Sequence, residues 1–445
     1  MSLKRLSLIG LLLCSPVHAA DLLEVYQEAI RTNPQLAAAR SSLAAVREQR
    51  PQALAQLLPS LDASGTIRRS RFQDVGPSGP ARYSTDKLAS LNLTQPVFRY
   101  DRWIGLNRSD SEIIRAEADY IAAQQDLMIL VTERYFKVLD AQDNLEFAEA
   151  EKKAIGRQLD QATQRFDVGL IAITDVKAAQ ARYDLSVSQE IQAISTLVAA
   201  KDDLREVTGT YYEHVNLLKA DLDLSNPEPN SPDAWIKQAK QHNLSILAAR
   251  ANTETARQDI RLQRAGHLPT LDLTASTSFR DVNFGGTFPQ KRHDTDIGFQ
   301  LNIPLYQGGA VNSRTRQARN RFQESTDRLQ QQVRSVELET RNAFRGVKTD
   351  IAQVKALGRS LESTEVAVEA EEAGFEVGTR TIVDVLNAQR EYFLARLNYA
   401  RARYLYVVDQ LRLKKASGIL TADDLEELNQ ALIPPSQNIS SPQTP

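Results

Sequence analysis

Two stretches, RFDVGLIAITDV at 165–176 and GFEVGTRTIVDV at 374–385, decide the fold, because each interrupts a very long helical pattern once. Gly169 and Gly378 can adopt the left-handed backbone that ends a helix. Each stretch therefore predicts the tip of a helical hairpin. Two ordinary helix turns would have a similar composition, but the same turn recurs at matching places in the two halves of the chain. We call these stretches the first tip and the second tip.

Candidate caps for the next helix follow each glycine. At the first tip, Thr174 or Asp175 can accept backbone N–H bonds, and at the second tip Thr381 is the candidate. Helices are therefore predicted after both tips, over about 173–207 and from the second tip to about 416.

Long helical patterns precede both tips. Apolar residues recur every seven positions from Leu106 to Phe166, with one shift of four, and again over about 312–374. A spacing of seven predicts helices that pack lengthwise against other helices, and the shift of four is a stutter that locally unwinds a supercoil. The abundance of Ala, Leu, Gln, Glu and Arg also favours helix.

A period-two pattern lies before each long helix and predicts a strand hairpin, at about 59–98 and 269–306. Apolar residues form one face of each hairpin and polar residues the other, with Gly-containing loops between the strands. Prolines mark the junctions with the helices: Pro59, Pro96, Pro269 and Pro304. Four strands cannot close a barrel, and an open edge in lipid leaves backbone groups unsatisfied. The strands therefore form either a small soluble sheet or part of a barrel shared by several chains.

The two halves of the chain are an internal repeat. Residues 33–62 match residues 243–272, with 10 of 30 positions identical, including Asn33 and Asn243. The predicted organisation is a signal peptide at 1–20, a first repeat at 21–225, a second repeat at 226–433 and a disordered tail at 434–445. In this arrangement the tips are about 167–175 and 376–384.

The first 20 residues have the pattern of a secretory signal. Lys4 and Arg5 form a charged start, LSLIGLLL an apolar middle and PVHAA a small-residue end, with cleavage expected after Ala19 or Ala20. The single cysteine, Cys14, lies in this segment and could alternatively be a lipid-attachment site. If Cys14 leaves with the signal, disulfides and cysteine-bound metals are excluded.

No catalytic constellation is present, and we expect neither enzymatic activity nor a cofactor. The five histidines are scattered without metal-ligand spacing, and no GxSxG, HExxH or phosphate-loop motif occurs. Lys and Arg total 54 against 56 Asp and Glu, so no basic excess points to nucleic acid.

Several strings, in this order, carry a family resemblance: VYQEA, QLDQATQRFDVGLIAITDV, GHLPTLDLTAST, NIPLYQGGAVNS and VGTRTIVDVL. Over essentially the whole mature chain, the sequence resembles the TolC family of outer-membrane efflux and secretion channels. The resemblance implies a mainly α fold with a small β part. Long antiparallel helical hairpins would form a trimeric α-barrel tunnel across the periplasm, and four strands per chain would contribute to a shared 12-stranded β-barrel in outer-membrane lipid. It also implies docking to an inner-membrane transporter, of RND, ABC or MFS type, and to a periplasmic adaptor protein.

The resemblance also implies site residues at the tips. Asp175 and Arg380 match an acid–arginine link that holds the tunnel shut, with Thr174 beside it. Opening would then move the tip helices outward. The alternative is a solvated surface pair, worth under about 1 kcal/mol. Positions expected to meet the adaptor are Gly169, Leu170, Gly378 and Thr379.

Two positions depart from the family pattern. Phe375 stands where the family pattern has a tyrosine, which is expected to form a hydrogen bond with the aspartate at position 175. Phenylalanine has no hydroxyl, so this hydrogen bond is absent or replaced. At the tunnel entrance Asp384 is present, but Asn387 stands where a second aspartate is expected. One acidic ring remains, and we expect weaker cation binding and a weaker latch.

Two hypotheses of function remain. The first is a passive trimeric channel that exports small toxic compounds, proteins or both. The second is a periplasmic coiled-coil adaptor or scaffold without a pore of its own. A steady current across a planar bilayer is expected only from the first.

Overall fold

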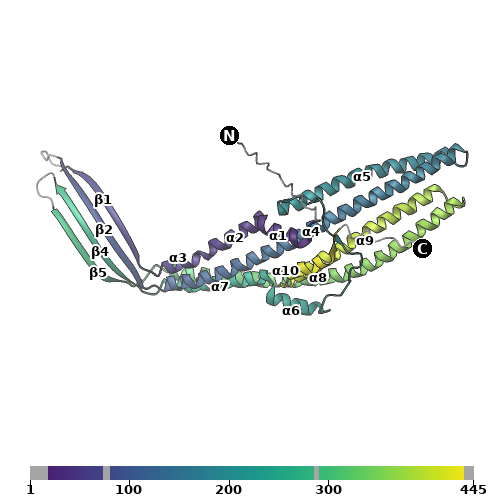
Figure 1. The fold of residues 1–445 in the computed structure, drawn as a ribbon. Coiled ribbons are helices and arrows are strands. Elements are labelled where there is room, and N and C mark those ends of the chain that lie inside the picture. The colour runs from purple at the N-terminus through teal and green to yellow at the C-terminus, as the bar shows by residue number, and fades with distance from the viewer. Residues whose placement is uncertain (1–18, 74–80, 285–289, 435–445) are drawn as a thin grey trace, which may run out of the picture. The chain divides into compact units, whose positions relative to one another are not determined.

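The computed structural model describes residues 19–73, 81–284 and 290–434. The predicted signal peptide and disordered tail lie almost wholly outside these residues, as do the loops of both strand hairpins. Most of the described chain is helical (Figure 1). The helices are α1 Leu22–Thr32, α2 Pro34–Arg47, α3 Gln49–Ala55, α4 Tyr100–Asp167, α5 Ile173–Thr208, α6 Pro232–His242, α7 Leu244–Ala265, α8 Ala310–Glu376, α9 Ile382–Ala416 and α10 Ala422–Gln430. The strands are β1 Ser60–Phe72, β2 Arg82–Phe98, β3 Leu217–Leu218, β4 Thr270–Phe284, β5 Gln290–Asn302 and β6 Leu432–Ile433.

The chain forms two compact units, and each draws on both repeats. The helical unit consists of Met1–Ala37, Ala123–Asn243 and Glu337–Pro445. The sheet unit consists of Ala38–Ala122 and Leu244–Val336. The two long helices α4 and α8 each begin in the sheet unit and end at a tip in the helical unit.

The predicted long helices are confirmed. Helices α4 and α8 have 68 and 67 residues, and α5 and α9 follow the tips with 36 and 35 residues. Helix α10 was not predicted. Among the described residues, no helix is both long and apolar enough to cross a membrane.

The internal repeat is confirmed by two equivalent asparagines. Asn33 ends α1, and its buried side-chain amide donates to the carbonyl oxygen of Val207 near the end of α5 (3.2 Å). Asn243 ends α6, and its amide donates to the carbonyl oxygen of Ala416 at the end of α9 (3.0 Å). A buried carbonyl without a partner is costly, so each asparagine fixes the short helix of its repeat to the end of a long one.

The two repeats are joined within the helical unit by contacts between α4 and α9. The Tyr404 hydroxyl donates to Asp143 (2.5 Å), and Arg401 forms an ion pair with Asp140 (2.7 Å). Further along the same helices, Arg412 pairs with Glu133 and Lys415 with Asp126. The short strands β3 and β6 also pair here, which brings the mid-chain linker to the C-terminal region.

The sheet unit contains one antiparallel sheet with the strand order β1-β2-β4-β5. The strands have 13, 17, 15 and 13 residues. The register places Leu61, Leu93, Ala275 and Ile297 in one row across all four strands. The predicted apolar face is therefore continuous. Within the described residues, β1 and β5 each pair on one side only.

The junction prolines are placed as predicted with one exception. Pro59 and Pro269 directly precede β1 and β4, and Pro304 follows the end of β5. Pro96 was expected to close its strand but lies inside β2, which continues to Phe98. The register shifts between Pro96 and Phe98, and this irregularity accommodates a residue that has no N–H to donate.

Candidate functional site at the tips of the helical hairpins

Both tips have the same backbone geometry. Gly169 has a φ of 79° and Gly378 a φ of 77°. At the first tip the Leu170 N–H donates to the Arg165 carbonyl (2.8 Å), and at the second the Thr379 N–H donates to the Gly374 carbonyl (2.9 Å). With the bonds from each left-handed glycine to the carbonyl three residues earlier, these are Schellman motifs. The predicted ends of α4 and α8 are confirmed.

The starts of the following helices differ between the tips. Thr381 caps α9 and forms a capping box with Asp384, whose carboxylate accepts from the Thr381 hydroxyl (2.7 Å) and backbone N–H (2.9 Å). The bond from the Thr381 hydroxyl is the largest cause that lowers the pKa of Asp384. At the first tip the cap is Ala172, which has no side chain able to accept. The prediction that Thr174 or Asp175 caps α5 is wrong, because both lie inside its first turn.

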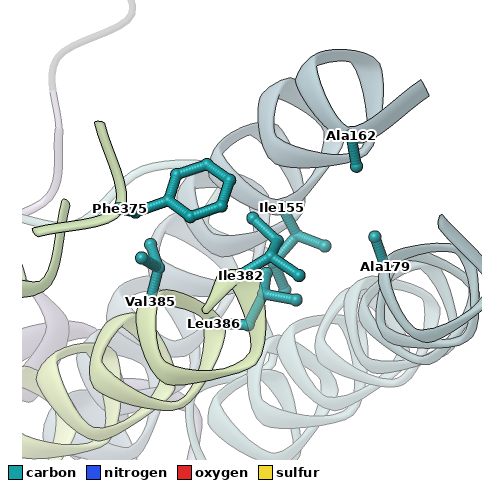
Figure 2. Packing of buried hydrophobic residues seen from close by; sticks show 7 residues of the cluster. All are labelled: Ile155, Ala162, Ala179, Phe375, Ile382, Val385 and Leu386. Atoms are coloured by element: carbon teal, nitrogen blue, oxygen red, sulfur yellow. The ribbon is translucent and has the colours of Figure 1, made fainter. Parts of the chain in front are cut away.

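An apolar cluster lies directly behind the tips and joins four helices (Figure 2). Its buried residues come from α4, α5, α8 and α9: Ile155, Ala162, Ala179, Phe375, Ile382, Val385 and Leu386. Leu159, Ile171, Val176 and Tyr183 pack against it. Both hairpins of one chain are thus held together at their ends by burial of apolar surface.

Phe375 occupies this cluster with only 7% of its surface exposed. The Arg165 guanidinium lies 4.3 Å from the centre of its ring, in cation–π geometry. Phe375 is therefore held by burial and by a contact from α4 to α8, and it has no hydroxyl to donate. Sequence reasoning did not identify Arg165.

Arg380 folds back over the end of its own α8. Its Nε lies 3.3 Å from a carboxylate oxygen of Glu371, and its side-chain carbons lie close to Gly374. That Glu371 oxygen is buried, and the contact lacks hydrogen-bond geometry. Among the described residues of a single chain, Arg380 and Asp175 do not form an ion pair.

Asn387 is used within the chain. Its side-chain oxygen accepts a bond from Arg182 of α5 (3.2 Å), so this pair connects the two hairpins below the tips. In addition, one hydrogen-bonded pair connects the two helices of each hairpin. Lys152 binds Glu190 across α4 and α5, and Gln389 binds Glu372 across α9 and α8. Arg182 was not predicted, since its partner is 205 residues away in sequence.

The outermost residues of both tips are apolar and exposed. Val168 is 70% exposed, Leu170 73% and Val377 76%. Gly169 and Gly378 lie beside them, with open space where a side chain would be. Such side chains at the end of a hairpin form a surface suited to a protein partner. Within residues 19–73, 81–284 and 290–434, no group of three His, Cys, Asp or Glu side chains could hold a metal ion.

Comparison with known proteins identifies the class of protein. The sequence matches the family described as "Outer membrane efflux protein" over residues 25–210 and 235–419, and the chain belongs to this family. The two matched ranges correspond to the two repeats.

Individual relatives extend over nearly the whole chain. Outer membrane protein TolC of Salmonella enteritidis is 38% identical over 438 residues, which cover 96% of this chain and 88% of the relative. TolC of Escherichia coli (strain K12) is 37% identical over 456 residues, covering 98% and 91%. The proteases secretion protein PrtF of Dickeya chrysanthemi is 29% identical over 418 residues, covering 92% and 90%.

Solved structures share the fold at low sequence identity. CusC matches with a TM-score of 0.78 at 19% identity, covering 90% of this chain and 92% of CusC. The CmeC outer membrane channel of Campylobacter jejuni matches with a TM-score of 0.76 at 18% identity, covering 93% and 90%. The chain is therefore a TolC-like efflux channel protein of the outer membrane.

Proposed function

We propose that three copies of this chain form a passive export duct across the outer membrane and the periplasm. The observation that carries this proposal is the sheet, which has a continuous apolar face and, in the part of the chain that the structure describes, pairs on one side only at β1 and at β5. In lipid such edges must be paired, and β1 of one copy can pair with β5 of the next. Three copies then give a closed sheet of 12 strands, within the known range for such barrels.

The tips are the proposed contact with partner proteins and the proposed gate. Val168, Leu170 and Val377 offer exposed apolar surface to a periplasmic adaptor, together with Gly169, Gly378 and Thr379. An inner-membrane transporter of RND, ABC or MFS type would supply the cargo. Among the relatives, PrtF is named for protease secretion and SrpC of Pseudomonas putida for solvent efflux. Small compounds, proteins or both are therefore candidate cargoes.

The gate residues would act between neighbouring copies. Within one chain Arg380 lies against Glu371 and forms no ion pair with Asp175, so we place the proposed link from Arg380 to Asp175 between two copies of the chain. Thr174 lies next to Asp175 in the first turn of α5. The buried cluster behind the tips keeps the two hairpins of one copy together, and opening would then separate copies rather than hairpins.

Planar-bilayer recording tests the duct. The purified full chain is expected to give steady channel currents, whereas a scaffold without a pore gives none. Arg380→Ala and Asp175→Ala are each expected to raise the conductance, with no further gain in the double variant. Glu371→Ala is the control for the contact inside the chain. If only Glu371→Ala changes the conductance, Asp175 is not the partner.

The entrance ring has its own test. Asp384 is proposed to form one acidic ring, and Asn387 bonds Arg182 instead of adding a second. Asp384→Ala is expected to abolish block of the current by divalent cations. Thr381→Ala also breaks the capping box but keeps the carboxylate, so block should persist in this variant. Block that survives in Asp384→Ala would exclude the ring.

A further inference from the structure

Basic residues gather on one face of the sheet, at the end remote from the helices. We define the basic patch as Arg69, Arg71, Lys87 and Lys291, all of which are exposed. Arg69 and Arg71 belong to β1, Lys87 to β2 and Lys291 to β5. Asp281 of β4 lies between the two lysines in the register. The patch thus has four cationic side chains and one carboxylate.

The register shows that the patch shares a face with the apolar rows. Side chains of a strand alternate between faces, so Arg69 and Arg71 lie on the same side as Leu61. In the strand register, Lys87 lies opposite Asp281, and Asp281 lies opposite Lys291. This row is on the same face as the row of Leu61, because the two rows are an even number of residues apart. A direct contact supports the placement of Arg69 on this face: its guanidinium lies 5.6 Å from the centre of the Tyr83 ring.

On the opposite, polar face of the sheet, two arginines form ion pairs with aspartates. There, Arg280 forms an ion pair with Asp86 and Arg292 forms one with Asp294, both at 2.5 Å. Two cations of the polar face are therefore neutralised by carboxylates. The excess of positive charge lies on the apolar face, where a neutral hydrocarbon surface would make it costly unless it meets an anion.

The position of the patch along the strands indicates which anion. From the row of Leu271, next to the helices, to the row of Asp281 is ten residues, or about 34 Å along the strand. At the usual tilt of about 40° this spans roughly 26 Å, close to the height of about 25 Å for the apolar band of outer-membrane barrels. Exposed Tyr83 and Phe279 lie near the same level, as aromatic residues do at a membrane boundary.

We propose that the basic patch binds the phosphate groups of a glycolipid, such as lipid A, in the outer leaflet. The acyl chains would lie on the apolar rows while the patch holds the phosphates, with arginine able to bind them in bidentate fashion. This inference rests on the proposed function, because it requires the sheet to cross the outer membrane with its hairpin end outward.

The chain offers a matched pair of variants. Arg68 and Arg69 are neighbours in β1, and Lys291 and Arg292 are neighbours in β5, but the members of each pair point to opposite faces. The test variant is therefore Arg69→Gln with Lys291→Gln, and the control variant is Arg68→Gln with Arg292→Gln. Both lose two positive charges from the same two strands.

The assay measures lipid retention by the full chain. The protein is reconstituted in phosphatidylcholine with a small fraction of lipid A, extracted in mild detergent, and examined by native mass spectrometry for the ratio of bound lipid A to phosphatidylcholine. Since each cation near an anionic lipid surface contributes about fivefold, the test variant, which lacks two of them, should lose about 25-fold of the enrichment. The control variant should keep it.

Three results would overturn the inference: equal enrichment in the test variant and the unaltered chain, a larger loss in the control variant, or equal retention of lipid A whose phosphates have been removed. Planar-bilayer currents recorded from the same preparations distinguish failure of the lipid-site proposal from failure of the export-duct proposal. Channel current without lipid A enrichment contradicts the lipid site alone. Absence of current from the unaltered chain contradicts the duct itself.

Discussion

Replacing Asp143 by asparagine tests how α4 of the first repeat is joined to α9 of the second. Burial is the largest influence on Asp143 and raises its pKa from 3.8 to about 6. The bond from Tyr404 opposes this effect, while the nearby carboxylates of Glu146 and Asp140 add to it. The carboxylate is thus ionised at neutral pH in a place that favours the neutral acid.

The raised pKa determines how stability depends on pH. Between about pH 4 and pH 6 the folded chain binds the Asp143 proton more tightly than the unfolded chain does. The free energy of unfolding therefore falls as the pH rises through this window, and the loss is complete above pH 6. A difference of about two pKa units corresponds to about 3 kcal/mol. An asparagine in place of Asp143 would carry no charge, and its amide oxygen can still accept the bond from Tyr404.

We therefore expect Asp143→Asn to be more stable than the unaltered chain at pH 7, by up to about 3 kcal/mol, and nearly equal to it at pH 4. Thermal unfolding followed by circular dichroism at pH 4, 5, 6 and 7 measures this difference as a shift in Tm. Glu133→Gln is the control, because it breaks the ion pair with Arg412 between the same two helices and leaves the carboxylates near Asp143 in place, so it should lower Tm. A decrease in Tm for Asp143→Asn that is the same at pH 4 and pH 7 would refute the reasoning.

Three further sets of substitutions test the tips and the repeat. Gly169→Ala and Gly378→Ala force a side chain into the left-handed backbone, and each should cost about 1–2 kcal/mol and speed proteolysis at its tip; unchanged cleavage would contradict this. Asn33→Ala and Asn243→Ala each remove a buried hydrogen bond to a carbonyl, so both should lower stability in denaturant titrations, by about 1–3 kcal/mol for Asn33 and by less for Asn243, because the Ala416 carbonyl keeps a bond from Thr340 (3.4 Å). An effect of only one would show that the two repeats are not anchored alike. Phe375→Ala should cost about 3–5 kcal/mol in the same titrations, whereas a loss below about 1 kcal/mol would mean that the cluster behind the tips does not depend on this ring.

Helix ends marked by a residue with special backbone freedom could be predicted from the sequence. Gly169 and Gly378 end α4 and α8, and Gly209 follows α5 with a φ of 73°. The seven-residue spacing then determined the long helices between these ends. Helix α10 was missed because it has only nine residues, although the capping box of Thr421 and Asp424 is a signal that could have revealed it.

The side-chain contacts of the site were much less predictable. Arg182 meets Asn387 only because α5 and α9 are brought together by the fold, and no local pattern links them. Arg165 meets Phe375 in the same way, across α4 and α8. At the first tip, two good capping residues lie near the start of α5, yet the helix begins one residue before Thr174. There, Asp175 interacts favourably with the positive end of the helix dipole from inside the first turn.

The one-sided pairing of β1 and β5 links folding to encounter between chains. In the proposed assembly, the backbone groups along both edge strands of the described sheet find partners when copies meet, so the stability of this unit would depend on how many chains are present in the same membrane. Before that encounter, each edge is also a template for unwanted strand pairing. A chain with a damaged β5 can still be joined through its intact β1, and it would leave a gap in every assembly that it enters. Defects in the sheet should therefore be dominant over intact copies, whereas defects confined to the core of one helical hairpin should not.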